Sequence, residues 1–328
     1  MTTGADASAD VDEFDFIARL MKPLTGGAPE ALGLLDDAAA IPARPGFDLI
    51  VTNDMIVEGV HFLPSDPLDR VARKLLRVNL SDLAAKGAQP WGWFLAVSWP
   101  ARCGWTEREA FAKGLAEDQA QFGLSLLGGD TTSTPGPLTA SATLLGWVPS
   151  GQAKLRSAAR SGDLILVSGT IGDGWLGLKA ARGEISAPMA LQRYRLPEPR
   201  LALRDALSAA HACADVSDGL LADAGRIAIA SGLGAQIDLD RLPLSEDGLR
   251  HVEGPGDPLS ALIDLASGGD DYELVLTAAP ARAQQVIAAA ATAGVRMTVV
   301  GRMSEGQGVR GLYQGREAQL GRLGYRHS

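Results

Sequence analysis

The sequence predicts a two-domain protein of mixed α+β and α/β class, and three observations support this. The chain has 328 residues, a length that suits about two domains. In its first half, apolar and amphipathic runs follow the order strand, helix, strand, helix, strand, strand, which is typical of helices layered on an open sheet. Residues 149–162 are rich in Gly, Ser, Lys and Arg. We therefore place a domain boundary there, between domains 1–148 and 149–328.

The composition argues against several classes of protein. A formal net charge of -9 disfavours a nucleic-acid partner held by a basic face. No apolar run of about 18 residues occurs, so no membrane-spanning helix is expected. Residues 1–12 lack the basic and apolar regions of a secretory signal, and we expect a frayed tail on a cytoplasmic protein. Cys103 and Cys213 lie far apart in sequence, which predicts neither a disulfide framework nor a thiolate zinc site.

Each element of the first half follows from the periodicity of its apolar residues. Residues 13–24 have helical spacing and predict a docking helix. Leu49-Ile50-Val51 predicts a short buried strand with Asp54 in the loop that follows it. Three tryptophans in the strand expected at 91–99 favour a self-associating dimer surface, with an ordinary core strand as the alternative. The other expected elements are helices 67–87 and 107–122 and strands 124–127 and 138–148.

The second half alternates strands and helices in the same way. Strands are expected at 163–169, 235–240, 272–277 and 296–301, and helices at 220–231 and 280–293. Residues 172–177 match G-x-G-x-x-G, but no strand ending in Asp or Glu follows about 20 residues on, so a nicotinamide site is disfavoured. The chain contains no G-x-x-x-x-G-K-[ST] sequence, so any nucleotide is held without a Walker loop.

Aspartates recur where apolar runs meet glycine or polar residues. Asp130 follows two glycines and precedes two threonines, which supplies hard oxygen ligands beside a backbone that can approach a ligand closely. Blander interpretations exist: a solvated turn for Asp36-Asp37, an intrahelical pair with Lys86 for Asp82, and helix capping for Ser217 or Asp218. Capping accounts for one group only, and paired carboxylates near a helix N-terminus favour magnesium bridging to phosphate. The recurring residues are Asp37, Asp54, Asp82, Asp130, Asp215, Asp218, Asp270 and Asp271.

Five sequence blocks in order resemble the thiamine-monophosphate kinase family, which belongs to the aminoimidazole-ribonucleotide-synthetase-like superfamily of ATP-using enzymes. The blocks are Val-Glu-Gly-Val-His-Phe (57–62), Asn-Leu-Ser-Asp-Leu-Ala-Ala (79–85), Gly-Gly-Asp-Thr-Thr (128–132), Asp-Val-Ser-Asp-Gly-Leu (215–220) and Gly-Gly-Asp-Asp-Tyr-Glu-Leu (268–274). The resemblance implies the two-domain fold of that superfamily. It also implies a homodimer formed through the N-terminal sheets, with ATP lying between the two halves of the chain.

The resemblance also implies which residues bind what. Arg156, Ser217, Gly129 and Asp130 would contact ATP, and His61, Asp270 and Arg322 would contact thiamine monophosphate. Four residues depart from the family's pattern: Leu35 for a glycine, Asn53 for a threonine ligand, Asp270 for a glutamate, and Arg322 for an aromatic residue that would stack on the substrate ring. The implied magnesium ligands are Asp37, Thr52, Asn53, Asp54, Asp82, Asp130, Asp215 and Asp218.

The expected reaction is direct in-line transfer of a phosphoryl group from ATP to thiamine monophosphate, which makes thiamine diphosphate. Several magnesium ions would offset the repulsion between the two polyanions. The acceptor phosphate has a second pKa of about 6, so no general base is assigned, and His61 is expected to orient the acceptor or to be structural. The alternatives are another ATP-using enzyme of the superfamily and a non-catalytic nucleotide-binding dimer.

Overall fold

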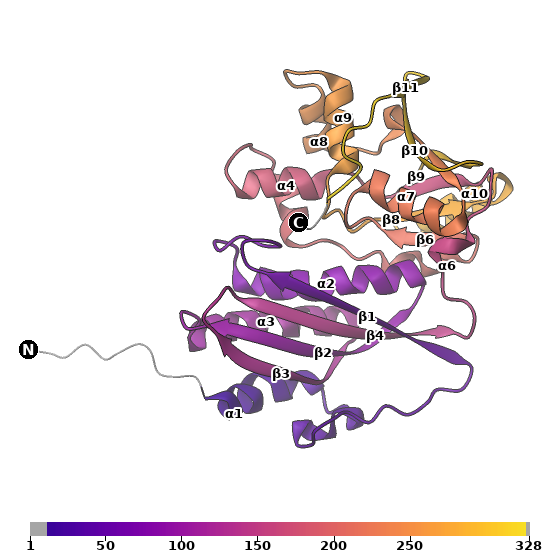
Figure 1. The fold of residues 1–328 in the computed structure, drawn as a ribbon. Helices are drawn as coiled ribbons and strands as arrows, with labels where there is room; N and C mark the ends of the chain where they lie inside the picture. The colour runs from indigo at the N-terminus through magenta and orange to yellow at the C-terminus, as the bar shows by residue number, and fades with distance from the viewer. Residues whose placement is uncertain (1–11, 326–328) are drawn as a thin grey trace, which may run out of the picture. The chain divides into compact units, whose positions relative to one another are not determined.

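The computed structural model describes residues 12–325, and the chain forms two compact units (Figure 1). The first unit runs to Asn79 and resumes from Pro90 to Trp147. The second comprises Leu80–Gln89 and the chain from Val148 onward. Each unit contains its own sheet with helices, as expected for the mixed class. Residues 80–86, the last part of the helix Leu68–Lys86 (α2), group with the second unit.

The sheet of the first unit has four strands in the order β1-β4-β2-β3. β2 and β3 pair in parallel, and β1 and β3 occupy opposite edges. This order matters for the site because both edge strands carry residues of the sequence blocks. The strands are Phe47–Val57 (β1), Gln89–Pro100 (β2), Ser125–Thr134 (β3) and Thr139–Pro149 (β4).

The tryptophans of β2 fill the core of the first unit. Trp93 and Trp99 are 0% and 1% exposed. The indole N–H of Trp93 donates to Gln119 of helix α3 (Trp105–Phe122), and the ring of Trp99 packs edge-on against Phe111. Burial of these large side chains stabilises the packing of α3 on the sheet. Trp93 and Trp99 therefore support the core-strand alternative, whereas Trp91 is partly exposed. The dimer surface stays a prediction.

The chain enters the first unit through an irregular helical segment. Asp12 caps α1 (Glu13–Phe16) by accepting the N–H groups of Phe14 and Asp15. The helix continues as a π-turn (η1, Ile17–Met21) and a 3₁₀-turn (η2, Lys22–Thr25), and a second 3₁₀ segment follows (η3, Pro29–Leu34). The expected helix at 13–24 is confirmed. Of the expected frayed tail, residues 1–11 lie outside the described part, and Asp12 belongs to the helix start.

The second unit contains a seven-stranded sheet in the order β11-β10-β7-β9-β5-β8-β6. β7 and β10 pair in parallel, whereas β5, β6, β8 and β9 pair antiparallel. The strands are Leu164–Ser168 (β5), Ala212–Asp215 (β6), Gly234–Asp238 (β7), Leu274–Ala278 (β8), Met297–Ser304 (β9), Gly308–Tyr313 (β10) and Arg316–Ala318 (β11).

Helices cover both faces of this sheet. Ile165 and Val167 of β5 pack in one core with α7 (Leu220–Ser231), while Leu166 packs in another with α6 (Arg204–Leu207) and α10 (Pro280–Thr292). Alternate side chains of β5 thus pack into the cores on opposite faces of the sheet. The remaining elements are α4 (Asp173–Ala181), α5 (Pro188–Arg195), α8 (Glu246–Val252), α9 (Pro258–Ser267), η4 (Arg156–Ala158), η5 (Leu201–Leu203) and η6 (Leu239–Arg241). No helix in residues 12–325 is long and apolar enough to cross a membrane.

Candidate active site

The first unit contains a cavity of about 560 Å³ in which the Gly-Gly-Asp-Thr-Thr block meets the Asp36-Asp37 pair. One wall is apolar, formed by side chains from the N-terminal helical segment and from β2. The polar lining consists of carboxylates and the glycine-rich part of β3. Such a combination of apolar walls and a few convergent polar groups is typical of a ligand site. The polar lining residues are Asp36, Asp37, Gly128, Gly129, Asp130 and Thr131.

The Gly-Gly-Asp block lies inside β3, beyond the strand end that we expected at residue 127. Phe94 of β2 pairs with Gly128, and the register shifts next to this pair. Gly129 has φ +158°, and a Cβ atom there would overlap the carbonyl oxygen of Leu95. Only glycine allows β3 to approach β2 this closely. The close pairing carries Asp130 and Thr131 into the cavity wall, where Thr131 accepts the indole N–H of Trp99 at 3.1 Å.

The Asp36-Asp37 pair reaches the same cavity from the end of η3. Leu32, Gly33 and Leu34 all have left-handed φ values, between 49° and 70°, and they turn the chain sharply before the pair. Leu35, which was noted as a departure from the expected pattern, has φ -113° and is not strained. The Asp37 N–H donates to the carboxylate of Asp36 at 2.8 Å. The cavity therefore brings the predicted ligands Asp37 and Asp130 together.

Asp54 lies within β1, which extends six residues beyond the expected strand end. Its backbone N–H donates to the side chain of Asn79 on α2 at 3.0 Å, and the Asn79 amide in turn donates to the Leu75 carbonyl at 2.9 Å. Asn79 is fully buried. Because Asn79 bonds to both α2 and β1, it holds β1 against the helix at the Asp54 position. Asn79 was not among the expected site residues, although it opens one of the sequence blocks.

Asn53 is separated from its neighbours by strand alternation. Thr52 and Asp54 share the more buried face of β1, and Asn53 points to the opposite, exposed face. There its amide donates to the Ala142 carbonyl at 3.1 Å and to the Thr143 hydroxyl at 2.8 Å, which ties β1 to β4. Asn53 therefore cannot bind a metal ion together with Thr52 and Asp54, and that expectation is corrected.

His61 closes a tight loop after β1. The N–H of Val57 donates to Nδ1 of His61 at 3.0 Å, and Nζ of Lys74 donates to the His61 carbonyl at 3.1 Å. A backbone amide can only donate, so Nδ1 carries the lone pair and the neutral ring has its proton on Nε2. Glu58 secures the same loop by pairing with Arg102 and by accepting the N–H of Leu138.

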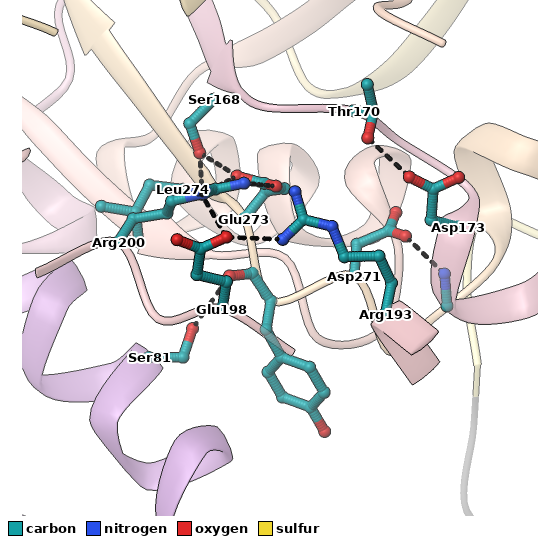
Figure 2. Close-up of polar contacts among 12 residues, drawn as sticks. Ser81, Ser168, Thr170, Asp173, Arg193, Glu198, Arg200, Asp271, Glu273 and Leu274 are labelled. Carbon is teal, nitrogen blue, oxygen red and sulfur yellow. Dashed lines mark hydrogen bonds and ion pairs between the residues drawn. The ribbon is translucent and has the colours of Figure 1, made fainter. Parts of the chain in front are cut away.

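In the second unit, two sequence blocks form interlocked loops. The N–H of Asp270 donates to the Ser217 carbonyl at 2.9 Å, and the N–H of Tyr272 donates to the Val216 carbonyl at 2.8 Å. The hydroxyl of Ser81, next to Asp82 on α2, donates to the Tyr272 carbonyl at 3.5 Å (Figure 2). The structure thus gathers the expected residues Asp82, Ser217, Asp218 and Asp270 in one region of this unit.

The loop 215–219 is held from inside α7. Expected capping by Ser217 or Asp218 is wrong: the residue before α7 is Gly219, and it makes no side-chain cap. Instead, the carboxylate of Asp223 accepts the N–H groups of both Ser217 and Asp218 at 3.0 Å. Burial raises the pKa of Asp223 to about 6, and the guanidinium of Arg226 opposes this shift.

Arg226 also pairs with Asp218, so the charge of this predicted metal ligand is balanced within the chain. Asp215 is 4% exposed at the end of β6. Asp223 and Arg226 were both missed by the sequence analysis. The sequence did contain a signal for Asp223, because it is a charged residue within the otherwise apolar start of α7. Its position in the first turn lets its carboxylate reach back to the loop that precedes the helix.

The last described residues run along both loops. The N–H of Tyr325 donates to the Asp218 carbonyl at 2.9 Å, and the hydroxyl of Ser267 donates to the Arg322 carbonyl at 2.9 Å. The Arg322 guanidinium lies 5.5 Å from the centre of the Tyr325 ring. Arg322 is therefore placed beside the predicted loops, next to an aromatic side chain. Arg156 lies exposed on η4.

The donor set fits magnesium that arrives with a nucleotide. Within residues 12–325, no three or more His, Cys, Asp or Glu side chains gather into a group that could hold a metal ion unaided. Magnesium in phosphate-transfer sites usually takes one or two carboxylates and completes its shell with phosphate oxygens and water. Asp37 and Asp130 at the cavity, and Thr52 with Asp54 on one face of β1, offer hard oxygens of that kind.

Comparisons with known proteins identify the family. The family model described as AIR synthase related protein, N-terminal domain, matches residues 35–148, and the corresponding C-terminal domain matches residues 160–314. A thiamine-monophosphate kinase of Caulobacter vibrioides is 55% identical over 326 residues, which cover 98% of this chain and 93% of the relative. The chain belongs to the thiamine-monophosphate kinase family. It is accordingly a kinase, a phosphotransferase of the two-domain fold.

Solved structures of thiamine-monophosphate kinases share this fold over nearly their whole length. The crystal structure of the enzyme from Stenotrophomonas maltophilia K279a has a TM-score of 0.81 and 38% identity, and the match covers 93% of this chain and 98% of that one. AaThiL complexed with AMPPCP and TMP has a TM-score of 0.74 and 28% identity, with coverage of 97% and 98%.

Proposed function

We propose that the protein transfers the γ-phosphoryl group of ATP to thiamine monophosphate and releases ADP and thiamine diphosphate. The observation that carries the proposal is the cavity of the first unit, which Asp37, Gly129 and Asp130 all line. The full-length similarity to AaThiL, a kinase seen with an ATP analogue and TMP, supports the choice of both substrates. The membership of the family disfavours the two alternatives raised from the sequence.

The substrate assignments follow the sequence blocks. We assign Gly129, Asp130, Arg156 and Ser217 to ATP. His61, Asp270 and Arg322 are assigned to thiamine monophosphate. Close backbone approach at Gly129 and the exposed guanidinium of Arg156 are consistent with binding a polyphosphate. The guanidinium of Arg322, 5.5 Å from the centre of the Tyr325 ring, supplies a planar cation beside the Asp270 loop.

Aspartates of both units would hold magnesium. The proposed ligands are Asp37, Thr52, Asp54, Asp82, Asp130, Asp215 and Asp218, without Asn53. When bound, magnesium supplies charge neutralisation between the two phosphate groups and stabilises the phosphoryl group in transfer. The chain's own contribution is to fix these carboxylates: Asn79 orients β1 at Asp54, and Asp223 with Arg226 fixes the Asp218 loop.

No residue needs to remove a proton from the acceptor. A phosphate monoester has a second pKa of about 6 and is largely ionised at neutral pH. His61 is fixed with its Nδ1 lone pair engaged by Val57, so the neutral ring presents an Nε2–H donor and has no lone pair left for a proton. We therefore assign His61 to hydrogen bonding with the acceptor phosphate, and the transfer to a direct in-line step without a phospho-enzyme.

A homodimer would complete the metal site. Asp54 and Asp130 lie on opposite edge strands of one sheet, and three strand spacings of about 4.8 Å separate them by roughly 14 Å. A single ion with ligands about 2.1 Å away cannot join them within one chain, whereas a second copy could bring its own edge strand alongside. The apolar side chains exposed on β1, Leu49, Val51 and Met55, offer a surface for that copy.

The experiment is a coupled measurement of both products. Purified protein is incubated with ATP, magnesium and thiamine monophosphate, and ADP and thiamine diphosphate are quantified by chromatography. We expect equal amounts of the two products and no thiamine diphosphate when thiamine replaces thiamine monophosphate. Release of ADP without thiamine diphosphate would overturn the proposal.

A further inference from the structure

The glycine-rich turn before α4 is the one sequence motif that the proposed function leaves unused. It matches a dinucleotide fingerprint, and helix N-termini with free N–H groups commonly bind phosphate. Here the N–H groups of Gly172 and Gly174 donate to the two carboxylate oxygens of Asp271, at 2.8 and 2.9 Å. Asp271 is buried, and burial raises its pKa while these two hydrogen bonds lower it. The turn is therefore occupied by a carboxyl group of the chain itself.

Asp271 sits between two residues with unusual backbone conformations. Asp270 has φ +71° and Tyr272 has φ +51°, both in the left-handed region. Side chains alternate along this loop: Asp271 and Glu273 are buried, whereas Asp270 and Tyr272 are partly exposed. Left-handed conformations of non-glycine residues persist only where the surroundings enforce them. The loop therefore needs fixed anchors to present Asp270 in this way.

Glu273 provides the second anchor of the loop (Figure 2). Its carboxylate accepts the hydroxyl of Ser168 at 2.5 Å and two N–H groups of Arg200 at 2.6 and 2.5 Å. The Ser168 hydroxyl also accepts the N–H of Leu274 at 2.8 Å. Glu273 is 2% exposed and Arg200 is 7% exposed. The end of the loop that leads into β8 is thus fixed in the core.

The turn before α4 also shapes the loop by contact. A Cβ atom at Gly174 would overlap the carbonyl carbon of Asp270, so the loop lies directly on the first turn of the helix. A Cβ atom at Gly177, one turn further, would instead overlap the Ala190 carbonyl of α5. Gly172 and Gly174 thus contact Asp271 or the backbone of its loop, whereas Gly177 allows α4 and α5 to pack closely.

We propose that Asp271 is a positioning residue for substrate binding: its carboxylate ties the loop 268–273 to the turn before α4 and thereby directs Asp270 toward thiamine monophosphate. The proposal rests on the proposed function, because it takes Asp270 as a substrate contact. It explains why two adjacent aspartates are needed. One faces the substrate, and the other is buried and holds the first in place.

The direct test replaces one acceptor oxygen. Asp271→Asn leaves a single oxygen for two N–H groups and places an amide N–H₂ against the other. We expect the KM for thiamine monophosphate to rise about tenfold while the KM for ATP changes less than about twofold. Asp173→Asn is the matched control, since Asp173 is a buried carboxylate on the same turn that contacts Thr170 and Ser245 instead of the loop. It should leave both KM values within about twofold of wild type.

A second pair of variants keeps every charge in place. Gly174→Ala pushes a methyl group into the Asp270 backbone and should raise the KM for thiamine monophosphate as Asp271→Asn does. Gly177→Ala introduces a comparable overlap with α5 and should lower the melting temperature without changing that KM. If Asp271→Asn does not fold, as judged by circular dichroism, the comparison of Gly174→Ala with Gly177→Ala tests the role of the loop. A KM for thiamine monophosphate that is unchanged in folded Gly174→Ala would then overturn the inference.

The outcomes separate this inference from the proposed function. Wild-type protein that makes no thiamine diphosphate overturns both. Wild-type protein that is active, with folded Asp271→Asn at an unchanged KM for thiamine monophosphate, overturns only the role of Asp271. An equal rise in the KM for ATP and for thiamine monophosphate also overturns it, because a general loss of structure would then explain the result.

Discussion

Thr52, Asn53 and Asp54 are consecutive in β1, yet only the first and third can serve one site. Strand alternation places Asn53 on the other face, where it bonds to β4. Asp54 in turn is oriented by a buried asparagine from α2. The chemical role of each side chain is thus decided by the face on which it lies and by the neighbour that fixes its backbone.

The first prediction compares these neighbours. Asp54→Asn should lower kcat for thiamine monophosphate by at least about 10³-fold, because it removes a charge proposed to hold magnesium. Circular dichroism should show an unchanged fold. Asn53→Ala is the control: it should keep near-normal turnover and cost about 1 kcal/mol of unfolding free energy through its lost hydrogen bonds. Comparable turnover in both variants would contradict the division of β1 into two faces.

The second prediction concerns His61. His61→Ala should lower kcat/KM for thiamine monophosphate about 10- to 100-fold, whereas His61→Gln, which retains an N–H donor, should lose less. Between pH 6 and pH 9, the pH profile of kcat/KM for wild-type protein should show no limb, that is, no fall in activity toward acid or alkaline pH, that is absent from the profile of His61→Gln. Such a limb would identify His61 as a base and would count against its assignment as a donor.

At the scale of elements, α2 is held in place by buried charge. The carboxylate of Asp118 on α3 is 0% exposed and accepts hydrogen bonds from Arg77 at 2.5 and 2.9 Å and from Arg73 at 2.8 Å. Arg77 also lies 5.3 Å from the ring centre of Phe122. Because α2 carries Asn79, this buried network fixes the part of the helix that orients β1 at Asp54.

The third prediction tests that network. Asp118→Asn should lower the free energy of unfolding by about 3–5 kcal/mol, since it leaves two arginines without their buried counter-charge. Glu117→Gln, at the exposed end of the same network, should cost less than about 1 kcal/mol. Urea denaturation followed by circular dichroism measures both. Equal losses would show that burial does not distinguish the two carboxylates.

Long amphipathic elements could be predicted from the sequence because their period extends over several turns. The helix expected at 67–87 is observed as Leu68–Lys86, and that at 280–293 as Pro280–Thr292. Short elements could not: β6 has four residues, all buried, and therefore no alternation. The predicted strands also ended too early. Pairing with β4 extends β1 through Asp54, and pairing with β2 extends β3 through Gly128, although the sequence there is polar or glycine-rich.

The candidate site was predictable in composition and not in arrangement. The sequence blocks contain Asp130 and Asp270, because carboxylates beside glycine stand out in a single chain. Asp37 was noted as one of two adjacent aspartates. The supporting residues Asn79 and Arg200 are distant in sequence from what they hold, and only the folded chain reveals them. Sheet order is equally hidden, and it separates Asp54 from Asp130.

At the scale of the whole molecule, the central claim is that one phosphoryl transfer uses carboxylates from two chains. Each sheet carries Asp54 on one edge strand and Asp130 on the other, too far apart to share an ion. A symmetric dimer would form two sites, each with Asp54 from one chain and Asp130 from its partner. Either Asp54→Asn or Asp130→Asn alone would then inactivate both sites of a homodimer.

The decisive measurement is therefore the activity of a mixed dimer. Asp54→Asn and Asp130→Asn chains are co-expressed with different affinity tags, and the heterodimer is purified over both tags. One of its sites contains both substitutions and the other contains neither, so the account predicts about half of the wild-type rate of thiamine diphosphate formation. A heterodimer as inactive as the two parent homodimers would contradict it.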